Sequence, residues 1–267
     1  MKPVASTPVS TALYEVFALS PKVPSRILLA LLSLTAAAAH AADDDHLTLG
    51  LGGAMAPRYE GADEYRLRPF PVVDAQYGRF FARSGDGLGL NIWQSAQLTI
   101  GAGVNMMQGY RQSDVPDGIG KLSDAVGARL FVSTNAWGAI FTLSATQAIS
   151  KSERGLTANA RLAYPYSVSD RFKVIPSVAV NWANAKYMNS YFGINAQQAA
   201  RSGLSQYRPS AGFKDVSLRL GFSYDLTKTW SLTGAAGVSR LLGDAADSPL
   251  VRRKSQALGA LGIAYRF

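Results

Sequence analysis

Apolar and polar residues alternate with a period of two along much of the chain after residue 45. Strict alternation of this kind is typical of a β-strand with one apolar and one polar face. Runs of about ten residues occur at 98–107, 156–164 and 216–226, which is the length a tilted strand needs to cross a bilayer, whereas soluble strands are nearer five or six residues. In the clearest run one face carries Val216, Leu218, Leu220, Phe222, Tyr224 and Leu226, and the other carries Ser217, Arg219, Gly221, Ser223 and Asp225.

Twelve segments of this type can be marked, and the links between them alternate in length. Short periplasmic turns and long outer loops are typical of outer-membrane barrels, and with both ends of the chain periplasmic the odd-numbered links face outward. The pattern therefore predicts an all-β fold, a single antiparallel transmembrane β-barrel of 12 strands. The third and fourth strands are short, and the segments lie at 46–56, 66–78, 79–84, 87–93, 96–109, 124–135, 138–151, 155–166, 173–187, 214–227, 229–242 and 256–267.

The end of the chain carries an apolar face that finishes on an aromatic residue: Leu261, Ile263, Tyr265 and Phe267. This pattern resembles the insertion signal of outer-membrane barrels, although a C-terminal strand of a soluble sheet could also end on Phe. Other aromatic residues lie at or near strand ends, as in a girdle at the headgroup level or simply as strand formers. They are Tyr77, Phe80, Trp93, Trp137, Tyr164, Tyr166, Trp182, Tyr187 and Trp230.

The beginning of the chain has the pattern of a secretory signal. A mixed segment with basic residues precedes an apolar core at 27–39, and Ala39-His40-Ala41 is a small-x-small cleavage site. An apolar core of this length is too short to span a membrane as a helix. We therefore predict a signal peptide at 1–41, a mature barrel at 42–267 that starts at Ala42, and localisation in the cell outer membrane.

Composition argues against several other classes of function. The chain has a formal charge of +9, but its Lys and Arg are scattered, so we expect no nucleic acid partner; the same charge suits a barrel that contacts outer-membrane lipid and anionic lipopolysaccharide. There is no Cys. The mature chain has one His, His46, which we expect to be a solvated turn residue. With no Cys and a single His, we expect no transition-metal site.

No catalytic apparatus is visible. The carboxylates Glu60, Asp63 and Glu64 lack an accompanying base or nucleophile and are expected to be solvated in the first outer loop. The segment 118–123 departs from a phosphate loop at Val115 and Leu122. We expect no enzyme activity and no catalytic, cofactor-binding or metal residues. Polar residues facing the lumen could pair across it, and glycines such as Gly50, Gly52, Gly89, Gly221 and Gly262 would thin the wall; the pairing candidates are Asp74, Arg129, Arg161, Arg219 and Asp225.

Several motifs, taken together, resemble the MipA/OmpV family. They begin with Leu49-Gly50-Leu51-Gly52 and 57–65, which includes Tyr59-Glu60-Gly61-Ala62-Asp63-Glu64-Tyr65, and continue with Arg68-Pro69-Phe70-Pro71 and 87–91. Further elements are 191–194, 207–216, 239–250 with Gly243-Asp244 and Ser248-Pro249, and the final Ala264-Tyr265-Arg266-Phe267. The resemblance implies an outer-membrane barrel that acts as a scaffold for a lytic transglycosylase and a murein synthase; other members are described as porin-like proteins or adhesins.

Three functions therefore remain open: a non-enzymatic scaffold for peptidoglycan-remodelling enzymes, a narrow porin-like channel, and an adhesin using loops 110–123 and 188–213. A scaffold for murein enzymes must present its contacts to the periplasm. The longest predicted periplasmic turn is 167–171, followed by Phe172. Because aromatic anchors tend to dominate binding energy, we predict Asp170, Arg171 and Phe172 as the partner contacts.

Overall fold

The computed structural model describes residues 45–267, and the expected signal peptide and cleavage site at Ala42 lie outside the described residues. The strands are β1 (His46–Pro57), β2 (Tyr65–Tyr77), β3 (Phe80–Arg83), β4 (Gly87–Gln94), β5 (Leu98–Met107), β6 (Ala125–Ala136), β7 (Ala139–Ala148), β8 (Leu156–Ala163), β9 (Tyr166–Ser167), β10 (Phe172–Ala183), β11 (Gly212–Asp225), β12 (Trp230–Leu241) and β13 (Ser255–Arg266).

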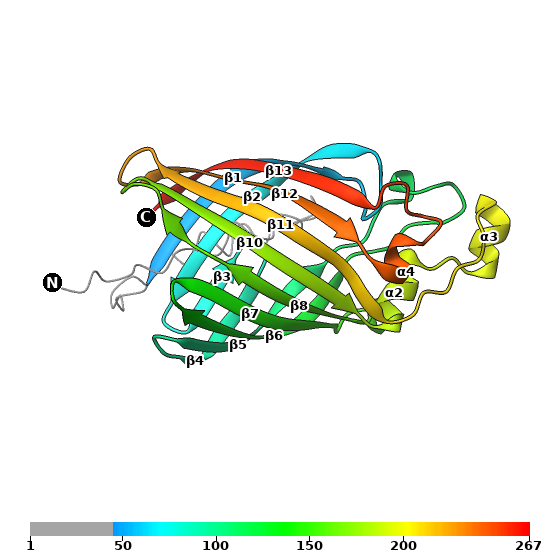
Figure 1. Ribbon diagram of the computed structural model, residues 1–267, viewed down its shortest axis with the longest axis horizontal. Helices are drawn as coiled ribbons and strands as arrows, with labels where there is room; N and C mark the ends of the chain where they lie inside the picture. Colours follow the sequence, from blue (N-terminus) through cyan, green and yellow to red (C-terminus); the bar gives the residue numbers. More distant parts are fainter. Residues whose placement is uncertain (1–44) are drawn as a thin grey trace.

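These strands close into an antiparallel barrel (Figure 1). Each strand pairs with its sequence neighbours, and β1 pairs with β13 to complete the ring. The two-residue strand β9 continues β8 after a break at Tyr164 and Pro165, and both pair with β10. Counting β8 and β9 as one strand, the barrel wall has twelve strands. The predicted 12-strand barrel is confirmed.

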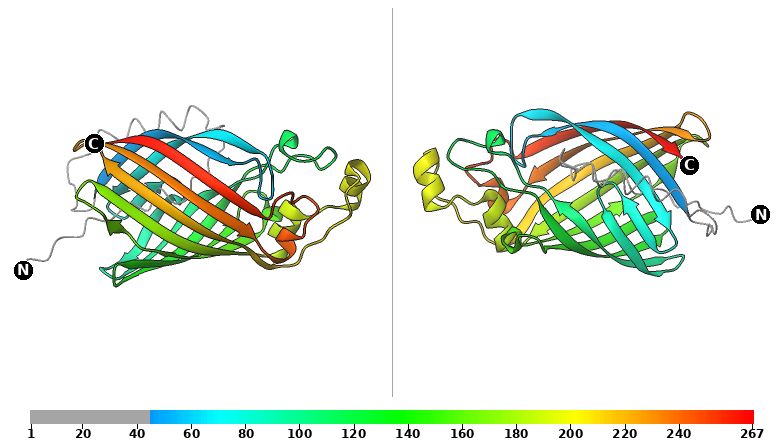
Figure 2. Two further views of the ribbon diagram at one scale, coloured as in Figure 1. Left: turned by 45° about the horizontal axis from the view of Figure 1, so that its top comes forward. Right: turned by 180° about the vertical axis from the view of Figure 1, so that it is seen from behind.

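The two ends of the barrel differ in their links. The described N-terminal end and Phe267 lie at the end with short turns, and the helices gather at the other end, as Figures 1 and 2 show. Those helices are η3 (Gln112–Asp114), η4 (Ser152–Arg154), α2 (Ala185–Phe192), α3 (Ala196–Ser202) and α4 (Gly243–Ala246). A search of residues 45–267 finds no helix with both the length and the apolarity needed to cross a membrane.

The predicted assignment of faces is confirmed. Leu218, Leu220 and Tyr224 are 59%, 49% and 41% exposed on the outside of β11, whereas Ser217 is buried. On the inside, large aromatic side chains lie over glycines of the neighbouring strand. A Cβ on Gly52 would be 2.5 Å from the ring of Phe70, and a Cβ on Gly89 would be equally close to Phe81. The inner glycines thus make room for rings that fill the lumen.

The predicted strand ends were too late in three places: at 151, where β7 ends at Ala148, at 166, where β8 ends at Ala163, and most of all in the ninth strand. The sequence predicts the ninth strand at 173–187, but β10 ends at Ala183. Asn184 then caps helix α2, because its side chain accepts a hydrogen bond from the backbone N–H of Tyr187 at 3.0 Å. An Asn at this position satisfies one of the free N–H groups of the first turn. Tyr187, predicted as a girdle residue, is therefore a buried residue of α2.

Most of the other girdle aromatics are exposed, and they lie at the end with short turns. Tyr77, Phe80, Trp93, Tyr164, Tyr166 and Trp230 are 43–64% exposed, and Trp137 is 97% exposed. The predicted C-terminal face also points outward: Leu261, Ile263 and Phe267 are exposed, and the Tyr265 ring packs edge-on against Trp230 at 5.1 Å. The role of this face as an insertion signal stays a prediction.

The wall is incomplete on one side, toward the outer loops. Strand β2 pairs with β3 only from Asp74 to Tyr77, and β5 pairs with β4 only as far as Val104. Among the described residues, no strand lies between residues 65–72 of β2 and residues 105–107 of β5. We call this opening the wall gap, and the rear view in Figure 2 shows the two strands apart there.

Candidate functional site: the capped outer mouth and the lumen beneath it

The outer loops pack into a cap over the barrel mouth, and the cap has a hydrophobic core of its own. Helix α2 buries Tyr187, Met188, Tyr191 and Phe192 on one face, the spacing of an amphipathic helix. Against them pack residues of the other outer loops, among them Tyr59, Ala62, Tyr110, Val115, Ile119, Ile194, Ala245 and Leu250. The outer end of the barrel is therefore closed by packed side chains.

The motifs that carry the family resemblance meet in this cap. The Tyr59 hydroxyl donates to the carbonyl of Leu250 at 2.9 Å, and the Ser248 hydroxyl donates to the carbonyl of Phe192 at 2.7 Å. The Gln256 side chain accepts from the N–H of Gly61 at 3.0 Å and donates to the carbonyl of Ala62 at 2.7 Å. These motifs therefore join the first outer loop to the last one.

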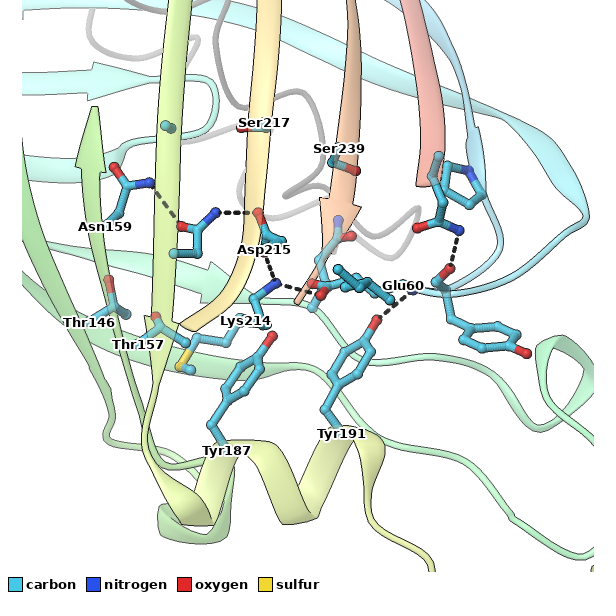
Figure 3. Close-up of a pocket in the computed structure, with 18 of the residues that line it drawn as sticks. Glu60, Thr146, Thr157, Asn159, Tyr187, Tyr191, Lys214, Asp215, Ser217 and Ser239 are labelled. Atoms are coloured by element: carbon cyan, nitrogen blue, oxygen red, sulfur yellow. Dashed lines mark hydrogen bonds and ion pairs between the residues drawn. The ribbon is translucent and has the colours of Figure 1, made fainter. Parts of the chain in front are cut away.

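A buried ion cluster lies on the lumenal side of α2 (Figure 3). Lys214 at the outer end of β11 binds Glu60 of the first outer loop and Asp215, the latter with Nζ and Oδ2 2.7 Å apart. The side chains of Lys214 and Asp215 are only 7% and 8% exposed. Hydrogen bonds extend this cluster from strand to strand: the Asn181 side chain donates to Asp215 at 2.7 Å, and the Asn159 side chain donates to Asn181 at 2.8 Å.

The tyrosines of the cap remain neutral. Burial raises the pKa of Tyr110 to about 12 and raises the pKa of Tyr187 and Tyr191 further. The Tyr191 hydroxyl accepts the backbone N–H of Glu60 at 3.3 Å, and the Tyr187 and Tyr191 rings stack with centroids 5.7 Å apart. Neutral rings can pack around the ion cluster and exclude water from it.

Two cavities lie in the lumen below the cap. The outer one, of about 270 Å³, is lined by Glu60, Tyr187, Tyr191, Lys214 and Asp215 and by polar residues of the inner wall. The inner one, of about 400 Å³, lies toward the periplasmic end, and Arg161 lines both. The outer cavity has five cationic residues against two carboxylates in its lining: Arg58, Arg68, Arg161, Arg219 and Lys214 against Glu60 and Asp215. Its charge favours an anionic occupant.

Several of the predicted lumen charges are indeed paired. Arg129 binds Asp86 at 2.8 Å, and buried Asp74 lies 3.5 Å from Arg83 Nε and 3.3 Å from His46 Nε2. The expectation that His46 is a solvated turn residue is therefore wrong, because it belongs to β1 and its ring is held against the Asp74 carboxylate. The ion pairs of Asp74 join the adjacent strands β1, β2 and β3. Arg219 lines the outer cavity, and Asp225 is half-buried at the periplasmic end of β11.

The predicted partner contacts lie on a hairpin at the periplasmic end. Asp170 and Arg171 are exposed in the turn before β10. Phe172 instead lies on the outer face of the wall, where its ring contacts Phe222 and Tyr224 with centroids 6.5 Å and 6.2 Å away. Two of the three residues thus lie in the turn and the third packs on outward aromatic side chains of β11. Their role as partner contacts stays a prediction.

Sequence reasoning missed the main residues of the cap. Glu60 was expected to be solvated, but it pairs with buried Lys214; Glu64 does pair at the surface, with Arg58 at 2.7 Å. Alternation along β11 would put Lys214 on the outward face with Val216 and Leu218, but the pairing with β10 shifts register here, from Asn181–Asp215 to Trp182–Phe213, and Lys214 is buried beside Asp215. A Lys next to an Asp at a strand end is too common to signal a site. The segment 118–123 lies in the loop between β5 and β6, and its Ile119 is part of the cap core. Residues 45–267 contain no cluster of three or more His, Cys, Asp or Glu that could hold a metal ion.

The barrel, its outward apolar face and its girdle of exposed aromatic residues define an outer-membrane β-barrel protein. The chain belongs to the family of the MltA-interacting protein MipA, whose model matches residues 49–267. It is 27% identical to the MltA-interacting protein of Escherichia coli K12 over 89% of this chain and 96% of that protein. It is 22% identical to the 24 kDa outer membrane protein of Pasteurella multocida over 78% of this chain and 85% of that one.

Among solved structures, the KdgM porin superposes with a TM-score of 0.45 and 9% identity, over 82% of this chain and 99% of the porin. A likeness of that size says nothing about what either barrel carries.

Proposed function

We propose that the protein is a non-enzymatic outer-membrane scaffold that holds a murein-remodelling enzyme at the inner surface of the outer membrane. The observation that carries this proposal is the packed cap, because a barrel closed by an apolar core and a buried ion cluster is poorly suited to steady diffusion of solutes. The name of the E. coli relative, MltA-interacting protein, supports a partner of the lytic transglycosylase type. A murein synthase is the second partner to test.

The contact surface is the periplasmic hairpin between β8 and β10. Its turn projects Val168, Ser169, Asp170 and Arg171, all exposed. Val168 supplies an apolar contact, 53% exposed, and the charged pair beside it can orient a partner. Phe172 serves this surface indirectly, because its ring packs the start of β10 against Phe222 and Tyr224 of β11.

Pull-down of a lytic transglycosylase and of a murein synthase by the folded barrel tests this assignment. We expect Asp170→Ala together with Arg171→Ala to weaken binding, while Phe172→Ala is measured separately because it also removes packing on Phe222 and Tyr224.

The matched control shortens the outer loop. Ile194 and Tyr207 form an isolated antiparallel bridge, so residues 196–205 can be replaced by a short Asn-Gly linker with the bridge kept. This variant should bind the enzymes as the parent does. Both variants are also tested for adhesion to cells. If the hairpin variant still binds the enzymes and the outer-loop variant loses adhesion, the scaffold proposal is wrong and the adhesin takes its place.

A narrow channel is the second candidate, favoured by the two polar cavities that share Arg161. Single-channel recording in planar bilayers separates it from the scaffold. The scaffold proposal expects no steady conductance from the parent barrel, because the cap closes the outer mouth. Steady conductance of the parent protein, unchanged when the cap is loosened by Lys214→Met, would favour the channel.

A further inference from the structure

The wall gap lies between β2 and β5 and is closed at its lower and upper edges by side-chain contacts. Its lower edge is the turn after β3, where the Ser84 hydroxyl donates to the carbonyl of Pro71 and accepts the N–H of Val73, both at 2.8 Å. Its upper edge is the ion pair between Arg66 and Asp114 at 2.8 Å. Between these edges the two strands are joined by one side-chain bond, from Arg68 Nη1 to Gln108 Oε1 at 3.2 Å.

The sequence of β2 suits a strand with a free edge here. Pro69 and Pro71 have no N–H to offer a neighbour, and proline within a sheet is confined to edges and bulges. The same prolines discourage a strand of another chain from pairing with this edge. The wall gap is therefore encoded in the Arg68-Pro69-Phe70-Pro71 motif.

The outer cavity reaches this gap. Its lining includes Arg68, Asn105 and Gln108 from the inner side and also Met106, which faces the membrane and is 38% exposed. Leu67, on the opposite border of the gap, is 68% exposed on the membrane side. A cavity with a cationic lining thus meets an apolar border on the outward face of the barrel, toward the end that carries the outer loops.

We propose that the outer cavity binds a single-chain anionic amphiphile, which enters sideways from the outer leaflet through the wall gap. The acidic head lies near Arg68 inside the cavity, and the alkyl chain extends between Leu67 and Met106 into the membrane. This inference is independent of the scaffold function, which concerns the periplasmic end of the barrel.

Size and polarity select this class of ligand. A volume of about 270 Å³ is just below the usual range of small-molecule sites, about 300–1,000 Å³, so a headgroup fits inside and a long chain does not. The excess of cationic residues in the lining favours an acidic head. Arg68 Nε and Asn105 Oδ1 are buried and have no hydrogen-bond partner among the described residues, so the mouth of the cavity keeps polar groups that a headgroup can engage after a small side-chain movement.

The test is photo-crosslinking of the folded barrel in a neutral detergent with palmitic acid that carries a diazirine a few carbons from its carboxyl group. Peptide mass spectrometry then maps the labelled residues. We expect labels concentrated at the borders of the gap, at Leu67 and Met106, and competition by unlabelled palmitate but not by hexadecanol. Butyrate, which has the same head and too short a chain to leave the cavity, should compete much more weakly.

Charge and access are tested by variants. Arg68→Met should weaken palmitate binding roughly tenfold or more, as expected for loss of a hydrogen bond to a charged group. Asn105→Leu, which fills the inner side of the gap without removing a charge, should weaken it as well. Arg208→Met, in an exposed position of the outer loop, is the control and should bind as the parent does.

Folding of each variant is checked by its heat-modifiable migration on gels. Labels spread evenly around the apolar band and insensitive to the headgroup would overturn the proposal. So would labels confined to lumenal residues, or unchanged binding by folded Arg68→Met and Asn105→Leu. A loss of enzyme pull-down with normal palmitate labelling would contradict only the scaffold function.

Discussion

Replacing Lys214 by methionine should destabilise the cap strongly. The substitution keeps the length and apolar body of the side chain but removes the cation that neutralises Asp215, whose side chain is 8% exposed. Removing one partner of a buried ion pair typically costs about 3–5 kcal/mol, because the other charge is left uncompensated. Glu60, with 35% exposure of its side chain, contributes less because water reaches it. We therefore expect the lower part of that range.

Urea unfolding of the barrel in lipid vesicles, followed by tryptophan fluorescence, measures this loss. The control is Lys254→Met, which breaks the exposed pair with Asp247, 54% and 64% exposed; such pairs contribute about 0–1 kcal/mol. Combining Lys214→Met with Glu60→Gln and Asp215→Asn should restore most of the stability, since no buried charge then lacks a partner. Equal losses for Lys214→Met and Lys254→Met would refute the reasoning.

Three further predictions concern the membrane face, the termini and pH. Leu220→Arg should weaken barrel insertion by about 2–4 kcal/mol if the site lies at the bilayer midplane, while Gly221→Ser on the lumenal face is tolerated; equal refolding titrations would contradict the assigned faces. N-terminal sequencing of protein from the outer-membrane fraction should begin at or close to Ala42, and recovery of residues 1–38 would exclude the cleavage site. The raised pKa of Tyr110, about 12, contributes stability that is present below the unfolded value near 10 and is lost as the pH rises through about 12. This amounts to about 3 kcal/mol, and tyrosinate absorbance should show a late-titrating group that shifts toward pH 10 in Lys214→Met.

The barrel could be predicted from sequence because the lipid and the lumen impose one simple rule on every strand. Alternation places Leu218 and Leu220 outside and Ser217 and Arg219 inside whatever the neighbouring strands are. Link lengths then fix which end is periplasmic. The largest boundary error, at Ala183, arose where this rule stops: beyond Asn184 the chain leaves the barrel wall and a helix cap decides its course.

The cap and the wall gap were beyond reach of that rule because both depend on contacts between distant segments. Tyr59 meets Leu250 across 191 residues, and nothing local in either loop predicts the partner of the other. His46 was misjudged for the same reason, since Asp74 comes beside it only through strand pairing. The short lengths of β3 and β4 were expected from sequence, but their consequence for the wall appears only in the register of β2 against β3.

The join between the first and last outer loops also sets an order of assembly. Tyr59 and Gln256 can find their partners only after β1 has paired with β13, because closing so long a loop of unfolded chain for a few hydrogen bonds is entropically unfavourable. We therefore expect the cap to form last, on the far side of the membrane, from loops that have already crossed it as unfolded chain. A chain stalled before closure would expose the tyrosines of α2 to water and reach the cell surface open, so accessibility of Tyr187 to surface labelling distinguishes a finished barrel from an arrested one.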